Sequence, residues 1–215
     1  MPDRIVEQLR KDIITGKYRR GDRFVENDLA ETFEASRGSV RSALQTLEGE
    51  GLIAILDNGR KMVTGFAEKD ARDLYELRWL LENRAVEIAW ERRTMAFAPM
   101  LKVLKRIEQS SKEPPEETDW FALDLDFHAA LIKAADSKPL MTAWEMTRPM
   151  MYALLELNTT TDYKEDYIEE FLEKHRGLSE MIISADKRLY EVLKDHIITG
   201  YDIAEGVIRH YRSLA

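Results

Sequence analysis

One aspartate and three histidines in the second half of the chain have the types and spacing of metal ligands. Asp124 and His128 are four residues apart and therefore share one face of a helix, while His175 and His196 each lie in the middle of a further helical stretch. Three helices that each direct a ligand inward can build a metal site in the core of a bundle. This donor set suits Zn²⁺, with Ni²⁺, Mn²⁺ or Fe²⁺ as alternatives. Each histidine taken alone is more typical of an ordinary hydrogen-bonded side chain, so spacing by itself leaves metal binding open.

A second group of side chains has the pattern of a DNA-reading helix. The stretch from Ser36 to Leu47 begins with a helix-capping serine, and an apolar stripe recurs along it: Val40, Ala43, Leu44 and Leu47. Arg37, Arg41 and Gln45 recur every four residues on the opposite side. A short helix with one buried face and one basic, hydrogen-bonding face is typical of a recognition helix for the DNA major groove. An ordinary solvated surface helix is the alternative.

The segments on either side of this stretch predict a winged helix-turn-helix. Helical periodicity precedes it at residues 3–15 and 26–33. Two β-type runs follow it at residues 52–56 and 61–64. Asp57-Asn58-Gly59, between the two β-type runs, is a strong hairpin signal. A hairpin placed directly after a helix-turn-helix is a wing, and Asn58, Arg60 and Lys61 at its tip could reach a minor groove or a phosphate.

The rest of the chain is predicted to be helical. Apolar residues recur at helical spacing in six segments, at residues 68–92, 97–111, 120–135, 139–157, 164–184 and 187–212. With only 10 Gly and 6 Pro, the chain is expected to be mainly α, with a winged helix-turn-helix over 1–66 and an all-α antiparallel bundle over 67–215. Acidic and basic residues balance in the first part, so the net charge of -8 lies in the second. This asymmetry indicates two modules with different partners.

Composition narrows the possible chemistry. The chain has no cysteine, which excludes disulfides, thiolate zinc sites and cysteine nucleophiles. A charged-then-apolar leader and an apolar run long enough for a bilayer are both missing from the sequence, so we expect a cytoplasmic protein without membrane association. No separate general base stands out near the candidate metal ligands, which argues against an enzyme.

Residues 1–66 resemble the winged helix-turn-helix of GntR-type bacterial transcription regulators. The resemblance rests on three blocks in family order: Leu9-Arg10…Ile13…Gly16, Gly21-Asp22-Arg23-Phe24-Val25-Glu26…Leu29-Ala30-Glu31 and Ser36-Arg37…Val40-Arg41…Ala43-Leu44…Leu47-Glu48…Glu50-Gly51-Leu52. Arg20 replaces the usual proline and Gly38-Ser39 the usual threonine-containing pair, so the operator sequence should differ from that of other members. By resemblance and position, the predicted DNA contacts are Ser36, Arg37, Ser39, Arg41, Gln45 and Asn58, with Asn27 as a further candidate.

Residues 68–212 resemble the helical FCD effector domain of the FadR-like branch, in its six-helix, VanR-like form. Leu74-Tyr-Glu-Leu-Arg78…Leu81-Glu82 is similar to the entry helix of that domain. The resemblance implies that its metal ligands are Asp124, His128, His175 and His196. The segment between Asp186 and His196 is one residue shorter than usual, so the start of the last helix decides whether His196 faces the site or is rotated about 100° away.

The resemblance also implies an effector, a small carboxylate bound beside the metal. Arg78 could grip its carboxylate with two hydrogen bonds. Arg148 and Tyr152 are further candidates for contacting it, although an ordinary ion pair and a core aromatic are the simpler interpretations of these two residues.

Together these features predict a ligand-responsive transcription regulator, not an enzyme. We expect it to bind a two-fold symmetric operator as a homodimer, because one recognition helix reads too few bases for specificity. By analogy with its branch, it should repress and be released by the carboxylate. Two alternatives are a metal-dependent, hydrolase-like enzyme in the helical bundle and a regulator for which the metal itself is the signal.

Overall fold

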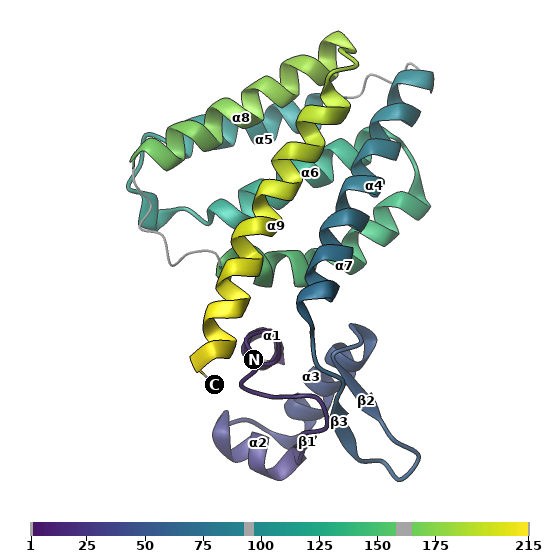
Figure 1. The fold of residues 1–215 in the computed structure, drawn as a ribbon, viewed down its shortest axis with the longest axis vertical. Coiled ribbons are helices and arrows are strands. Elements are labelled where there is room, and N and C mark those ends of the chain that lie inside the picture. The colour runs from purple at the N-terminus through teal and green to yellow at the C-terminus, as the bar shows by residue number, and fades with distance from the viewer. Residues whose placement is uncertain (1, 93–96, 158–164, 215) are drawn as a thin grey trace. The chain divides into compact units, whose positions relative to one another are not determined.

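The computed structural model of the protein describes residues 2–92, 97–157 and 165–214 (Figure 1). The chain forms two compact units. One contains the residues up to Ala71 together with those from Ala204 onward, and the other contains Arg72–Ile203. Within the described residues, strands occur only in the first unit. The predicted fold class is therefore confirmed: a winged helix-turn-helix is followed by an all-α region.

Three helices and three short strands form the winged helix-turn-helix. They are α1 (Pro2–Ile14), β1 (Arg23–Phe24), α2 (Glu26–Thr32), α3 (Arg37–Gly49), β2 (Ile53–Ile55) and β3 (Lys61–Val63). The strands pair antiparallel in the order β1-β3-β2, with Arg23 opposite Met62 and Ile53 opposite Val63. The predicted hairpin is thus present, but β1 is an additional strand. A two-residue strand is too short to show an alternating pattern in the sequence.

Helix α3 is held by its apolar stripe and by its ends. Val40, Ala43, Leu44 and Leu47 are completely buried, and α3 packs against α1 and α2. At its start, the Ser36 hydroxyl oxygen accepts a hydrogen bond of 3.1 Å from the Ser39 amide, the usual N-cap arrangement. Just beyond its end, Glu50 accepts two hydrogen bonds from Arg10 of α1, at 2.8 and 2.5 Å. These contacts fix the helix with its polar side toward solvent.

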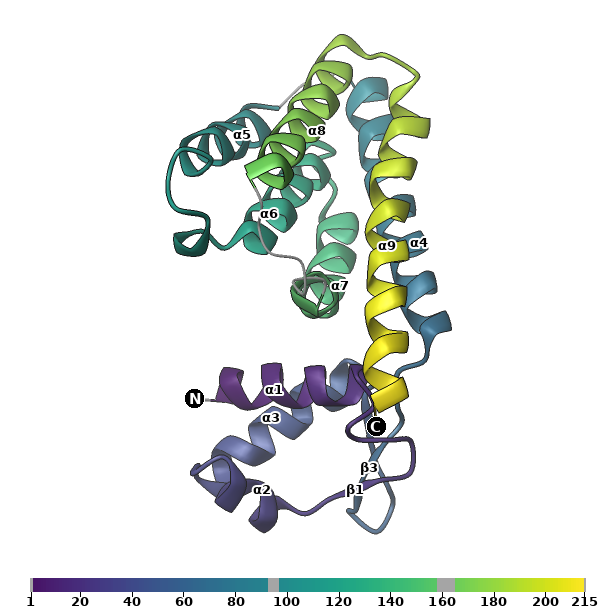
Figure 2. The same ribbon diagram turned by 60° about the vertical axis from the view of Figure 1, so that its left-hand side comes forward.

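Six α-helices follow in the described part of the chain (Figure 2). They are α4 (Glu68–Arg92), α5 (Ala98–Ser110), α6 (Trp120–Ala134), α7 (Lys138–Leu157), α8 (Glu165–Ser184) and α9 (Leu189–Leu214), with a short 3-10 helix at Pro115–Glu117. Helix α6 is central, because 11 of its 15 residues are buried, and it packs on both α5 and α7. The described helix ends lie within two residues of the predicted ones, and the predicted start at residue 164 lies outside the described residues. Among the described helices, none combines the length and apolarity needed to cross a bilayer.

Helices α4 and α9 run side by side in opposite directions (Figures 1 and 2). Aromatic pairs join them, with Tyr75 5.9 Å from Tyr201 and Trp90 5.7 Å from Tyr190 between ring centroids. Gly200 permits this approach, because a Cβ at that position would lie 3.1 Å from Cε1 of Tyr75. This pairing places the inner faces of both helices next to the buried α6.

Candidate metal and effector site

The four predicted metal ligands converge in the helical unit. Asp124 and His128 come from α6, His175 from α8 and His196 from α9, and one ligand atom from each lies within 4.8 Å of all the others. Asp124 Oδ1 is 3.2 Å from Nε2 of His175, 3.6 Å from that of His128 and 4.0 Å from that of His196. The Nε2 atoms of His128 and His196 are 3.2 Å apart. The cluster is buried, and His128 and His175 have no exposed surface.

This geometry fits a divalent metal ion. Metal–nitrogen and metal–oxygen bonds of about 2.0–2.2 Å place two ligands of one ion roughly 3.0–4.2 Å apart, depending on the coordination angle. The four spacings given above, 3.2, 3.6, 4.0 and 3.2 Å, fall in that range. Three imidazoles and one carboxylate are also the donors that Zn²⁺ and neighbouring transition metals bind. The cluster could therefore hold a metal and leave positions open for a further ligand.

In two of these histidines, the ring nitrogen that points away from the cluster has a hydrogen-bonding partner in the protein. Nδ1 of His128 lies 2.5 Å from Glu82 Oε2, and Nδ1 of His175 lies 2.7 Å from the Phe171 carbonyl oxygen. Because a carbonyl oxygen only accepts, the His175 Nδ1 carries a proton, and Nε2 is the nitrogen of this ring that could bind a metal. Outer partners of this kind orient metal-binding histidines and strengthen them as ligands.

Burial and nearby charges shift the pKa of three members of the cluster. Although burial raises it, the pKa of Asp124 is held well below its usual range by Arg78 and His128, so this carboxyl is ionised. Burial, reinforced by His128 and His175, holds the pKa of His196 well below its ordinary value, so this ring is neutral. Burial opposes a positive charge on His128, but Glu82 outweighs it and raises the pKa of His128. The position of the His196 ring beside Asp124 and His128 shows that it faces the cluster despite the shorter spacing before it, and its role as a ligand stays a prediction.

Arg78 of α4 joins the cluster to a cavity. It donates a hydrogen bond of 2.8 Å to Glu82 and one of 3.1 Å to Asp124, and it is only 2% exposed. Burial disfavours its charge, but the carboxylates of Asp124 and Glu82 raise the pKa of Arg78 above its ordinary value. Two of its five N–H donors are used in this way, and the others remain for a ligand.

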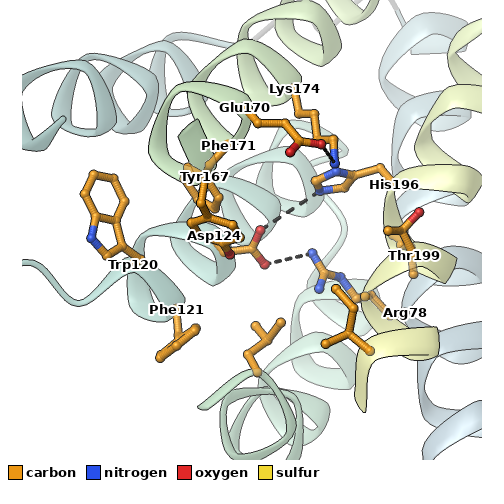
Figure 3. Close-up of a pocket in the computed structure, with 14 residues that line it drawn as sticks. Arg78, Trp120, Phe121, Asp124, Tyr167, Glu170, Phe171, Lys174, His196 and Thr199 are labelled. Atoms are coloured by element: carbon orange, nitrogen blue, oxygen red, sulfur yellow. Dashed lines mark hydrogen bonds and ion pairs between the residues drawn. The ribbon is translucent and has the colours of Figure 1, made fainter. Parts of the chain in front are cut away.

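The cavity beside Arg78 has a volume of about 270 Å³. In Figure 3, Asp124, Arg78 and His196 face one another, with Trp120 and Phe121 on the side away from Thr199. The lining residues come from α4, α6, α7, α8 and α9. A ligand in this cavity would reach Arg78 and the metal cluster together.

The two further effector candidates lie elsewhere in the structure. Arg148 donates a hydrogen bond of 2.6 Å to Asp126, and the Tyr152 hydroxyl donates one of 2.9 Å to Asp119. Neither is among the described residues that line the cavity. Both positions on α7 agree with the simpler interpretation of a structural ion pair or aromatic, so an effector contact by Arg148 or Tyr152 stays a prediction that the geometry does not support.

The predicted DNA contacts lie together on α3 and the wing. Four of them are exposed, at Ser36, Arg37, Gln45 and Asn58, and Ser39 is half-buried beside the cap. Asn58 is in the hairpin loop, where its side-chain oxygen accepts a hydrogen bond of 3.1 Å from the Arg60 amide. Their role in DNA binding stays a prediction, made from a shared exposed surface.

Arg41 is exposed too, but it is held by a residue that the sequence analysis did not single out for a role. Glu26, the first residue of α2, accepts hydrogen bonds from Arg41 at 3.0 and 3.3 Å and from Lys61 of β3 at 2.7 Å. Hydrogen bonds from these two cations lower the pKa of Glu26 to about 2. Glu26 therefore sets the position of a predicted DNA contact and links α2, α3 and the wing.

We expect Glu26→Gln to lower the free energy of unfolding by about 1 kcal/mol at pH 7, a small effect because the Arg41 side chain is 58% exposed. A carboxyl with a lowered folded pKa stabilises the fold above its unfolded pKa, and that contribution is lost as pH falls through the folded value. The difference between the two proteins should therefore shrink between pH 4.5 and about 2.

Urea unfolding followed by circular dichroism at pH 7 and pH 3 measures this difference. Glu48→Gln is the matched control, since Glu48 is an exposed carboxylate on α3. A difference of the same size at both pH values would show that Glu26 does not act through its charge.

Two family models match the chain. The model described as "Bacterial regulatory proteins, gntR family" matches residues 2–63, and the model described as "FCD domain" matches residues 73–199. The chain belongs to the GntR family and carries an FCD domain. The resemblance seen in the sequence is therefore confirmed, including the FadR-like branch to which such regulators belong.

Relatives of this GntR-family chain are similar along most of their length. The HTH-type transcriptional regulator YdhC of Bacillus subtilis is 28% identical over 91% of this chain and 85% of its own. The gluconate operon transcriptional repressor of the same species is 31% identical over 86% of this chain and 77% of its own. The crystal structure of a putative transcriptional regulator GntR from Rhodococcus sp. RHA1 superposes with a TM-score of 0.58 at 22% identity, covering 95% of this chain and 97% of that one. This last likeness shows a shared fold.

Two features of the site had no role in the sequence analysis. Glu82 is completely buried behind His128, but the sequence analysis named it only as part of the family motif. Its position could have revealed it, because it lies on the apolar side of a helix, four residues after Arg78. The aromatic side of the cavity combines residues of α6 and α8, and no local spacing in the sequence relates these two helices.

Proposed function

We propose that this protein is a ligand-responsive, DNA-binding transcription regulator whose effector is a small carboxylate bound beside a metal. The observation that carries the proposal is the buried cluster of one aspartate and three histidines, which opens beside Arg78 into a cavity of about 270 Å³. The same chain carries a winged helix-turn-helix with an exposed basic helix. A candidate effector site and a winged helix-turn-helix in one chain of this family support regulation rather than catalysis.

In this proposal, Asp124, His128, His175 and His196 hold a divalent ion, with zinc preferred and nickel, manganese or iron as alternatives. The bound ion supplies open coordination positions for an oxygen ligand. Arg78 provides the second half of the site, because its remaining N–H donors can bind the other carboxylate oxygen. Because the ion and Arg78 would each bind one carboxylate oxygen, the site would favour carboxylates over neutral ligands of similar size.

The output is proposed to be repression. The chain would bind a two-fold symmetric operator as a homodimer, with residues 1–66 on DNA and residues 67–215 supplying the effector site and the dimer contact. A relative that is 31% identical carries the name of an operon repressor, which supports repression. Release by the ligand is proposed by analogy with the branch. Action in the cytoplasm stays a prediction.

Arg78→Lys tests the effector site. Lysine keeps the charge but loses the planar fork, so we expect the carboxylate concentration needed to release operator DNA to rise about tenfold or more. The measurement is fluorescence anisotropy of a labelled duplex, selected from random sequences by the protein itself, with zinc-loaded protein and a panel of benzoate, glutarate and gluconate.

The matched control for this experiment is Arg84→Lys, an exposed arginine of the same helix that pairs with Glu87 at 2.9 Å. It should leave release by the carboxylate unchanged. Operator affinity that responds to zinc alone, and to no carboxylate, would replace this proposal with the metal-sensing alternative.

A further inference from the structure

We infer that the effector is a carboxylate with a flat, apolar ring rather than a polyhydroxylated chain. This inference rests on the proposed function and concerns the same cavity. The cavity residues fall into three zones, and each zone restricts a different part of the ligand.

The buried end of the cavity is the carboxylate end. Arg78 and Asp124 are buried there, and His196 is half-buried beside them. Arg78 gives one hydrogen bond to Asp124 and one to Glu82, and its guanidinium has further N–H donors that can bind a ligand oxygen. An anionic head group fits it, as the proposed function requires.

The walls of the cavity are largely apolar. Three aromatic side chains line it: Phe121 comes from α6, while Tyr167 and Phe171 come from α8, with their ring planes tilted by only 32° at 6.4 Å between centroids. Aliphatic side chains line it as well, namely Leu155 of α7 with Ile197 and Ile203 of α9. Together they form an apolar slot suited to a planar ring.

The polar side chains at the exposed rim are few, and each has a contact with another protein group. Lys174 and Glu170 pair with each other at 2.7 Å, and the Thr199 hydroxyl donates its proton to the Asp195 carbonyl oxygen at 2.7 Å. A ligand with a hydroxyl group on each carbon would place several of them against the apolar lining, where they would lose hydrogen bonds to water, which is costly. The lining therefore disfavours sugar acids, including gluconate, the compound named for one relative's operon.

Size agrees with a single ring. An apolar cavity of about 150 Å³ accepts benzene, so 270 Å³ has room for a ring, a carboxylate and one small substituent. We therefore expect benzoate-like acids to bind more tightly than open-chain or hydroxylated acids of the same length.

The test is isothermal titration calorimetry of the full-length, zinc-loaded protein with benzoate, cyclohexanecarboxylate and gluconate. We expect benzoate to bind at least about tenfold more tightly than gluconate, because the slot leaves hydroxyl groups unpaired, with cyclohexanecarboxylate between them. Gluconate binding as tightly as benzoate would overturn the ring inference but leave the proposed carboxylate effector intact. Failure of all three acids to bind would overturn both.

Tyr167→Leu separates ring stacking from simple apolar burial. Leucine keeps an apolar side chain, so benzoate affinity should fall about three- to tenfold while that of cyclohexanecarboxylate changes less than about twofold. Tyr211→Leu is the control, because Tyr211 has a similar exposure of 37%, against 42% for Tyr167, and does not line the cavity. Equal weakening of both acids by Tyr167→Leu, or no weakening of benzoate, would overturn the inference.

Discussion

Replacing His175 with alanine should abolish stoichiometric zinc binding. His175 is completely buried, its Nε2 lies 3.2 Å from Asp124 Oδ1, and its other nitrogen is fixed by the Phe171 carbonyl. Outer partners alone change metal affinity by about 10- to 100-fold, so removal of a ligand should weaken zinc binding by at least about 100-fold. Metal analysis after dialysis, together with titration against a competing chelator, measures the loss.

A graded variant keeps this test informative if His175→Ala folds poorly. Glu82→Gln leaves all four ligands in place but replaces the charged partner of His128 at 2.5 Å, so we expect one bound zinc with an affinity about 10- to 100-fold lower. His210→Ala is the control, because this fourth histidine is exposed on α9 and outside the cluster. Full zinc retention by His175→Ala would show that the cluster is not a metal site.

Arg37→Ala should weaken operator binding by about 5- to 150-fold, the range of one bidentate arginine–guanine contact. Arg37 is the first residue of α3 and exposed, and no described residue forms an ion pair with it. Its guanidinium can therefore meet a base edge without breaking a contact in the protein. Arg41, in contrast, must keep or exchange its pair with Glu26 when it meets DNA.

Fluorescence anisotropy with the selected duplex and with scrambled DNA, each at two salt concentrations, distinguishes base reading from phosphate contact. Loss of a base contact should lower affinity for the selected duplex much more than for scrambled DNA. Arg4→Ala is the control, since Arg4 is an exposed arginine on α1 and not on α3. Unchanged binding by Arg37→Ala would remove Arg37 from the predicted interface.

The DNA-binding half of the protein was well predicted because its signals are local. The stripe from Val40 to Leu47, the cap at Ser36 and the Asp57-Asn58-Gly59 turn each act within a few residues, and the structure has α3 and the hairpin at those positions. The features that the sequence analysis did not predict are those that depend on residues far away in the sequence. Strand β1 exists only because Arg23 and Phe24 pair with β3, and Glu26 is held by Arg41 and Lys61 from 15 and 35 residues away.

The sequence by itself determined the family, the fold class and the types of side chain in the candidate metal site, because motif spacing, helical periodicity and the i, i+4 relation of Asp124 and His128 are properties of short segments. Only the tertiary structure decided which side chains meet. The rotations of α8 and α9 bring His175 and His196 to Asp124, 51 and 72 positions away in the sequence. Packing of α4 against α6 also places Glu82 behind His128. Helix rotation depends on burial of whole apolar faces, so no single spacing in the sequence could fix it.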